Sequence, residues 1–166
     1  AVAGRLKALL AVVETERKGY VDGLVRAISS DVNALYARIH PHEPLGGSSL
    51  YVKPNVAGSL ELRASFGSAA DVAPGAYSTA AHLDTLGLCV SLALARRGGA
   101  QPGIQNGGQI VVLDDVLTSV DDQHLDRIIA LLAEEAGRLG QLIITTHSRA
   151  LFDRVRGRLQ PTARGL

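Results

Sequence analysis

The run QIVVLDDVLTSVD, residues 109–121, constrains the fold of this chain more than any other stretch. Ile110 to Leu113 is an unbroken apolar run rich in β-branched residues, which predicts a short strand buried on both faces of a parallel sheet. Two carboxylates, Asp114 and Asp115, follow at the C-terminal end of that strand, where open α/β sheets bind their ligands. Adjacent acids there are unfavourable unless a cation or a proton transfer requires them, so the pair is a candidate site. The alternative interpretation is that both acids cap the following turn and helix.

A second strand and helix follow this acidic pair. The pattern predicts a helix from Asp121–Asp122 to about Leu139, an apolar strand over residues 141–145, and a short helix after His147. Strand, helix, strand and helix in this order indicate a parallel sheet with right-handed crossovers. Such a sheet brings the acidic doublet and His147 to one edge. That convergence is the strongest argument from the residues for a functional site.

The first 40 residues predict one long helix, because apolar residues recur at spacings of three and four. Pro41 and Pro44 end this helix, and Gly46-Gly47 is expected to form the turn after it. Two interpretations stay open: an amphipathic helix on a globular core, or the end of a coiled coil entering a head domain. We expect residues 1–40 to form this helix and residues 41–166 to form one lobe.

A β-hairpin is predicted over residues 48–53 and 59–66, with its turn at residues 54–58. Apolar and polar residues alternate along the second strand, which indicates one buried face and one solvated face. Lys53 and Arg63 could touch a phosphate backbone, although a solvated sheet face explains them better. The small, polar stretch 67–75 is predicted to be a loop.

A helix start and its hydroxyls make a second candidate site. Ser78 or Thr79 is expected to cap a helix that runs through TLGLCVSLALARR, residues 85–97. Backbone N–H groups at such a start can bind phosphate, although capping alone explains the hydroxyls equally well. The following loop, residues 98–108, contains glycines but no GxxxxGK[ST] pattern. That pattern occurs nowhere in the chain, so the chain has no P-loop.

Composition sets the outer bounds. With 166 residues, 46% hydrophobic and 20% charged, the chain is expected to be one soluble globular domain. The single cysteine, Cys89, is expected to be a core residue and suits a reducing cytosol. The apolar run 86–95 is too short to cross a membrane, and a net charge of +1 favours no partner. The absence of methionine, even at position 1, indicates a piece of a longer protein. His40, His42 and His124 are predicted to be surface or capping residues.

Three segments in this order, STAAHLDTLGLCVSLAL, IVVLDDVLTSVD and LIITTHSR, resemble the C-terminal half of an ABC-type ATPase head. Within that class the chain is similar to the SMC, RecF and RecN-like coiled-coil ATPases, over nearly all of residues 20–156. The resemblance implies an α/β fold, the C-terminal lobe of a P-loop NTPase. In such a lobe helices flank a parallel sheet core, with a β-hairpin and a long N-terminal helix. It also implies that the P-loop belongs to the N-terminal half of the same head.

The resemblance assigns roles to the residues of the sheet edge. Asp114 matches the Walker B aspartate, which helps to hold Mg²⁺, usually through water. Asp115 matches the catalytic acid that orients or deprotonates the attacking water, and His147 matches the switch histidine that reaches the γ-phosphate of ATP. Phosphoryl transfer depends mainly on positioning and charge stabilisation, so an acid near the water and a metal on the phosphates suffice.

The resemblance also assigns residues that act across a dimer of heads. Thr118 to Asp121 matches the D-loop, which crosses the dimer interface, so Asp121 is expected near the nucleotide. Thr79, or its neighbour Ser78, matches the signature serine, which contacts the γ-phosphate held by the opposite subunit. Ala80-Ala81 stands where many members carry a glutamate or glycine followed by a glycine, which places Ala81 beside the nucleotide as well. The added Cβ atoms hinder close backbone approach to a phosphate.

The resemblance therefore implies a cytoplasmic ATPase head that binds ATP and Mg²⁺ between two copies and has no membrane partner. It implies work on DNA, in repair, chromosome maintenance or defence. Asp115 replaces the commoner glutamate and is one methylene shorter. With the altered signature, this keeps open a module that dimerises on ATP without hydrolysing it. A third hypothesis, the nucleotide-binding subunit of an ABC transporter, shares these motifs, but the long N-terminal helix and the LYARIHP segment argue against it.

Overall fold

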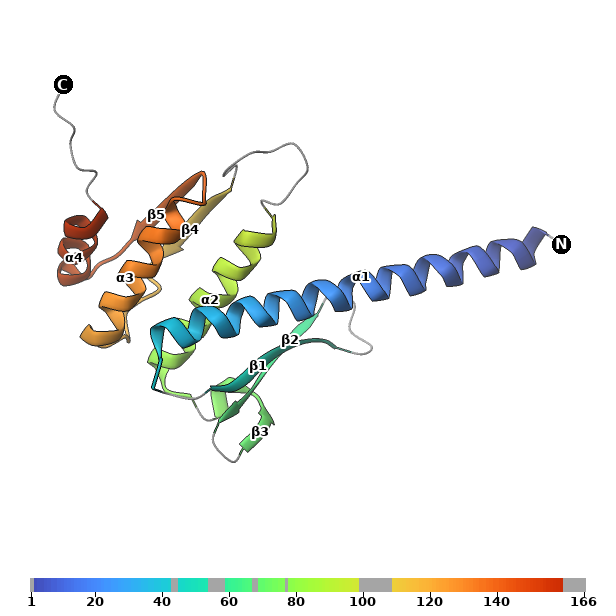
Figure 1. Cartoon of the computed structure of the whole chain (residues 1–166), viewed down its shortest axis with the longest axis horizontal. Helices are drawn as coiled ribbons and strands as arrows, with labels where there is room; N and C mark the ends of the chain where they lie inside the picture. The colour runs from blue at the N-terminus through green and yellow to red at the C-terminus, as the bar shows by residue number, and fades with distance from the viewer. Residues whose placement is uncertain are drawn as a thin grey trace, which may run out of the picture.

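The computed structural model describes residues 2–42, 45–53, 59–66, 69–76, 78–98 and 109–159. Figure 1 shows three antiparallel strands at one side of the chain, and the β4–β5 pair with α3 and α4 at the end far from the N-terminus. The elements follow in the order α1 (Val2–Ile39), β1 (Leu45–Val52), β2 (Leu60–Phe66), β3 (Ala69–Val72), the 3-10 helix η1 (Pro74–Ala76), α2 (Ala80–Gly98), β4 (Ile110–Asp114), α3 (Asp122–Ala136), β5 (Gln141–Thr145) and α4 (Arg149–Leu159). This confirms the predicted α/β fold with a long N-terminal helix, a β-hairpin and parallel strands.

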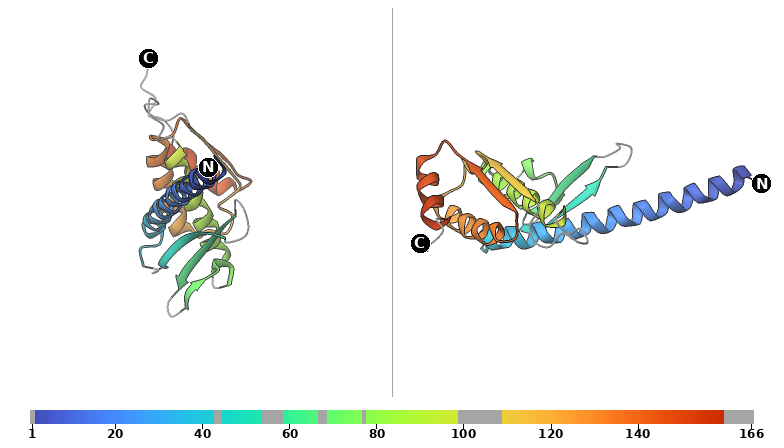
Figure 2. Two further views of the ribbon diagram at one scale, coloured as in Figure 1. Left: turned by 90° about the vertical axis from the view of Figure 1, so that its right-hand side faces the viewer. Right: turned by 90° about the horizontal axis from the view of Figure 1, so that it is seen from above.

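The helix α1 has two contrasting halves. Its N-terminal part projects away from the rest of the chain in both views (Figures 1 and 2), and its apolar side chains there are exposed: Val2, Leu6, Leu9, Leu10, Val12, Val13, Tyr20 and Leu24. The C-terminal part is packed into the core through Val25, Ile28, Val32, Leu35, Tyr36 and Ile39. The spacing of three and four residues continues across both parts, so one apolar stripe is half covered and half bare. The division into a helix of residues 1–40 and a lobe of residues 41–166 stays a prediction.

Polar side chains of α1 complete the open edge of β1. Asn33 accepts from the backbone N–H of Ser48 at 2.6 Å and donates from Nδ2 to the Ser48 carbonyl at 2.9 Å. Ser29 Oγ accepts from the Leu50 N–H at 2.9 Å. Because β1 is an edge strand, these bonds satisfy backbone groups that would otherwise meet solvent. The predicted turn at Gly46-Gly47 was wrong: both glycines lie within β1, at a register irregularity where Gly47 has a φ of +111°.

The predicted loop over residues 67–75 was also wrong in part. Residues 69–72 form β3, which pairs antiparallel with β2, and residues 74–76 form η1. Arg63 on β2 bonds Asp71 on β3 at 3.0 Å, and Asp71 has a φ of +56°. A four-residue strand with two alanines has little intrinsic strand signal. It forms because β2 offers it a pairing edge, which is a tertiary effect.

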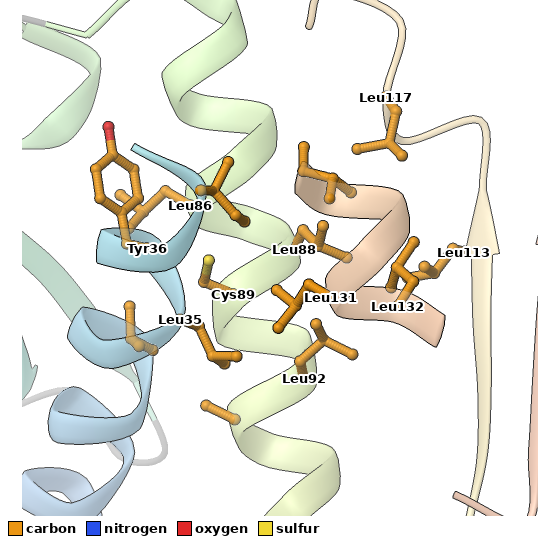
Figure 3. Close-up of a cluster of buried hydrophobic side chains, with 14 of the residues drawn as sticks. Leu35, Tyr36, Leu86, Leu88, Cys89, Leu92, Leu113, Leu117, Leu131 and Leu132 are labelled. Atoms are coloured by element: carbon orange, nitrogen blue, oxygen red, sulfur yellow. The ribbon is translucent and has the colours of Figure 1, made fainter. Parts of the chain in front are cut away.

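The core lies between three helices and one face of the parallel sheet. In Figure 3, α2 runs between α1 and α3, and Leu113 of β4 faces α3. Cys89 is fully buried in this layer, as predicted, and burial raises the pKa of its thiol to about 12. The helix α3 ends at Ala136 rather than near Leu139.

One charged side chain lies within this core. Glu135 on α3 is 1% exposed and accepts two hydrogen bonds from Arg96 of α2, at 2.7 and 2.9 Å. Arg138 adds a third at 2.9 Å. The hydrogen bonds from Arg96 hold the pKa of Glu135 below its ordinary value, although burial opposes the shift. The pair therefore ties the C-terminal end of α2 to α3.

The prediction that β4 is buried on both faces was wrong for this chain. Leu113 is buried and Val111 packs against the core, but Ile110 and Val112 are 63% and 58% exposed. On β5, Ile143 is 38% exposed in the same way. Within the described ranges, the helices cover one face of the β4–β5 pair and leave the other exposed. We call the other face the open sheet face and define it by Ile110, Val112, Asp114, Gln141, Ile143 and Thr145.

Several predictions fall on residues outside the described ranges. These are the hairpin turn at residues 54–58, the loop over residues 99–108 and the helix stop at Pro44. Within the described residues no helix is long and apolar enough to cross a membrane.

Candidate functional site

The candidate site is built at the C-terminal ends of β4 and β5. The two strands are parallel, and their register sets Asp114 directly opposite Thr145. Asp115 then leaves the strand with a φ of +53°, a left-handed conformation that aspartate tolerates better than most residues. Its N–H donates to the Thr145 carbonyl at 3.0 Å, which fixes this sharp turn onto β5. The backbone conformation is strained, and such strain clusters at functional sites.

Asp115 and His147 form a direct pair across the two strand ends. His147 Nδ1 lies 2.7 Å from each carboxylate oxygen of Asp115, and the His147 backbone N–H points to Oδ1 at 3.4 Å. An ionised carboxylate only accepts, so Nδ1 carries the proton and Nε2 faces away from the acid. Both side chains are open to solvent, at 43% and 73% exposure. The prediction that the acids and the imidazole share one rim of the sheet is confirmed.

Asp114 has a different partner. Its Oδ1 accepts a hydrogen bond from the hydroxyl of Thr145, and both side chains are exposed on the open sheet face. Thr145 is not among the predicted site residues. The signal was available, because two parallel strands of equal length that both end in polar residues set those residues side by side.

The chemistry of Asp114 fits Mg²⁺. Carboxylate oxygens are the ligands Mg²⁺ takes from proteins, and it usually binds one or two of them while keeping waters and substrate phosphates. Among the described residues there is no group of three histidine, cysteine or acidic side chains that could hold a metal by itself. The described part of the chain therefore supplies at most part of a magnesium shell, with Asp114 as the available carboxylate.

The segment Thr118 to Asp121 lies between β4 and α3. Asp121 is the N-cap of α3: its carboxylate accepts from the His124 N–H at 3.0 Å and contacts His124 Nδ1 at 2.6 Å. The backbone bond from His124, then its ring, lowers the pKa of Asp121. The Ser119 N–H donates to Asp84 of α2 at 3.3 Å, so this segment is attached to both helices.

The two hydroxyls before α2 differ in access. Thr79 is exposed, and its Oγ1 accepts from the His82 N–H at 3.4 Å, which confirms the predicted cap. Ser78 Oγ is buried and has no hydrogen-bond partner among the described residues. Thr79 is therefore the hydroxyl that an external phosphate could reach. Ala81, one residue into α2, is half-buried.

The structure places these residues in two groups. Asp114, Asp115 and His147 converge on one rim, whereas Ser78, Thr79 and Ala81 lie at the start of α2. The bond between Asp84 and Ser119 joins the start of α2 to the segment that follows β4. Asp84 was missed by the sequence analysis, because only the fold brings the two segments together.

The predicted surface position of His40 was wrong. His40 is 3% exposed, and its ring stacks on Tyr36 with centroids 4.6 Å apart. It also meets the rings of His82, at 5.1 Å, and His124, at 4.1 Å. His124 takes part in the cap of α3, because its N–H donates to Asp121, and His42 is exposed. Both agree with the predicted surface or capping positions. Sequence spacing gave no sign of this cluster, because its rings come from three separate helices.

Comparison with known proteins identifies the fold. No protein-family model matches the chain, and no curated protein matches it by sequence. Among solved structures, an SMC head domain with a coiled coil and joint from Pyrococcus yayanosii superposes with a TM-score of 0.65 over 89% of this chain, at 19% identity. An SMC head from Pyrococcus furiosus with an extended coiled coil, bound to the C-terminal domain of ScpA, gives 0.64 over 91%, at 18% identity. The chain thus has the fold of part of an SMC-type ATPase head.

The chain is shorter than these relatives. It covers 26% of the P. yayanosii chain and 34% of the P. furiosus chain. A third SMC head, bound to the C-terminal winged-helix domain of ScpA, matches with a TM-score of 0.62 and 17% identity, and the chain spans 40% of it. The part of the SMC head that the chain resembles is the C-terminal part.

Proposed function

We propose that this chain is the C-terminal lobe of an SMC-like ATPase head that hydrolyses ATP once the rest of the head completes it. One observation carries the proposal: the Asp115–His147 pair sits beside Asp114 at the C-terminal rim of two parallel strands, where open α/β sheets bind ligands. The likeness in fold to SMC heads supports it.

The exposed apolar residues of the open sheet face favour a partner that binds there and supplies the P-loop. Ile110 and Val112 are large, apolar and more than half exposed, on strands that continue the rim of the site. The chain has no P-loop, and it spans well under half of the three SMC head chains described above. We therefore assign the N-terminal half of the same head to this face, where its own sheet would bury the apolar side chains and bring the P-loop to Asp114.

The chemistry follows from the groups at the rim. Water attacks the γ-phosphorus of ATP and forms a new P–O bond while the bond to the ADP oxygen breaks. The products are ADP and inorganic phosphate, and the water proton passes to the Asp115 carboxylate or to a phosphate oxygen. Asp115 is the acid that orients or deprotonates this water, and His147 holds the Asp115 carboxylate through Nδ1. When Nε2 also carries a proton, it donates to an oxygen of the phosphate. Asp114 is the residue of this chain that would hold Mg²⁺, which neutralises phosphate charge when bound. Thr145 fixes the Asp114 carboxylate by its hydrogen bond.

The start of α2 and the D-loop are proposed to act on a second copy of the head. Thr79 is exposed at a helix start, whose N–H groups and dipole favour an anion, so it is the better match to the signature serine. Asp121 ends the D-loop and is expected near the interface. ATP would then be sandwiched between two heads, and its hydrolysis would release them. One solved structure of similar fold concerns the ATP-driven dimerisation and DNA-stimulated activation of SMC ATPases. This motivates the proposal that the chain acts on DNA in the cytoplasm.

The test is ATP turnover by a fusion of this chain to the P-loop half of its own head. We expect no turnover by the chain alone and magnesium-dependent turnover by the fusion. Asp115→Asn should keep ATP binding and slow turnover by about two orders of magnitude, since general-base positioning contributes 10²–10⁴-fold. Asp153→Asn is the matched control, because Asp153 is an exposed acid on α4 that pairs with the exposed Arg149. Unchanged turnover in Asp115→Asn would refute the role given to Asp115.

A second candidate function is a dimerisation module that binds ATP without cleaving it. Two observations favour it: the acid is the shorter aspartate, and its carboxylate is already held by His147. Cleavage of ATP in a single turnover by the completed head would exclude this alternative.

A further inference from the structure

Three histidines and a tyrosine form a continuous stack beneath the start of α2. His40 is the central ring, and it follows directly on the last residue of α1. Its ring is stacked on Tyr36, is tilted against His124 and meets His82 edge-on. Aromatic rings at these separations attract each other beyond the area they bury. Because His40 is 3% exposed, the contacts are protected from solvent.

Two residues whose rings contact His40, namely His82 and His124, are each bonded to one segment of the proposed nucleotide site. His82 lies in the first turn of α2, and its N–H donates to Thr79 at 3.4 Å. His124 lies in the first turn of α3, and both its N–H and its Nδ1 contact the Asp121 carboxylate. The ring of His40 therefore contacts two residues of the site. His82 is bonded to Thr79, the proposed signature hydroxyl, and His124 is bonded to Asp121 at the end of the D-loop.

We propose that His40 is a positioning residue that sets the start of α2 and the D-loop relative to each other and to the long helix α1. Within the D-loop, Val120 packs against the core, and the neighbouring residues are more open. Thr79 is exposed, and the D-loop residues Thr118 and Ser119 are exposed. Besides the stack, Asp84 bonds the Ser119 N–H at 3.3 Å. The role in ATP hydrolysis rests on the proposed function, whereas the mechanical role does not.

The same ring connects these segments to the projecting helix. Between Val25 and Ile39 α1 is packed into the core, so its C-terminal end can rotate or shift only together with His40. A displacement of α1 would reach Thr79 through His82 and Asp121 through His124. The stack thereby gives the helix a contact route to both segments that are expected to meet the second head.

The test compares two replacements of similar size. His40→Leu keeps an apolar side chain that fills the volume but removes the ring, and His40→Phe keeps the ring. The exposed His42→Ala is the matched control. Hydrogen exchange is measured on the chain itself, in peptides covering residues 78–85 and 117–124. Exchange in both peptides should be about tenfold faster in His40→Leu and close to wild type in His40→Phe and His42→Ala, because the ring pairs of His40 with Tyr36, His82 and His124 are lost in the first variant only.

Turnover by the completed head gives the second readout. In His40→Leu the kcat should fall several-fold while ATP binding by one head is unchanged, and His40→Phe should restore kcat. The proposal is overturned if Leu and Phe behave alike, if neither peptide responds, or if exchange rises equally across all peptides of the chain. If the wild-type head does not turn over ATP, the proposed function fails, and the exchange result still decides whether His40 holds the two segments.

Discussion

The two sides of the β4–β5 sheet differ in completeness. On the helical side, Leu113 meets a layer of buried leucine and isoleucine side chains, and the buried carboxylate of Glu135 accepts hydrogen bonds from Arg96. On the open sheet face, Ile110 and Val112 are exposed, and the acids and His147 stand in solvent. The strand β4 therefore has one face that packs against the core and one face that is exposed. The difference indicates that the helical side holds this chain together, whereas the open sheet face is the side to which we assign the N-terminal half of the proposed head.

The largest expected difference is between one core leucine and one open-face valine. Leu132→Ala on α3 should reduce the free energy of unfolding by about 3 kcal/mol, because it removes a fully buried side chain and leaves a cavity. Val112→Ala should reduce it by less than about 1 kcal/mol, since that side chain is 58% exposed. Urea unfolding of both variants measures the difference. Equal losses would mean that the open sheet face is covered in solution.

A smaller difference is expected between two neighbouring glutamates. Glu135→Gln leaves Arg96 without its charged partner and should reduce the free energy of unfolding by about 2 kcal/mol at pH 7. Glu134→Gln disturbs only the exposed pair with Arg38 and should reduce it by less than about 1 kcal/mol. Thermal unfolding of the two variants side by side tests this. A harmless Glu135→Gln would show that the buried pair does not stabilise the α2–α3 contact.

The pH dependence of Glu135 follows from the same pair. Its folded pKa lies below the ordinary value of 4.5, because Arg96 donates to the ionised form. The stabilisation is therefore complete above pH 4.5 and is lost as the pH falls through the lowered folded pKa. The stability gap between wild type and Glu135→Gln should shrink as the pH drops below 4.5. A gap that stays constant down to pH 2.5 would contradict the assigned pairing.

The smallest expected effect on stability is at the rim itself. Asp115→Asn should change the free energy of unfolding by less than about 1 kcal/mol, since the pair with His147 is exposed. The left-handed backbone at this position, with a φ of +53°, is tolerated by asparagine as well as by aspartate. Denaturant unfolding of the chain alone measures this. A loss above 2 kcal/mol would place the Asp115–His147 pair among the groups that hold the fold.

Much of the fold could be predicted because its signals are local. The apolar period of α1 and the runs that became β4 and β5 each lie within one segment. The convergence of Asp115 and His147 was also predictable, because parallel strands end at the same edge of a sheet. The exposure of one face of β4 could not be predicted. An apolar run has the same sequence pattern whether its second face packs against this chain or against another.

Other features depend on contacts between distant segments. The strand β3 forms on the edge that β2 offers, and its own residues carry little strand signal. His40 lies between the end of a helix and Pro41, where a surface residue is the ordinary expectation, and only the packing of three helices buries it. Asp84 and Thr145 likewise gain their partners from the fold.

The central claim is that the rim of Asp114, Asp115 and His147 cleaves ATP once the open sheet face is covered. Single-turnover cleavage by the completed head, with ATP bound before magnesium is added, tests it most directly because binding is separated from chemistry. We expect wild type to release phosphate and Asp115→Asn to hold intact ATP, with a rate lower by about two orders of magnitude. Equal cleavage rates in the two proteins would contradict the account.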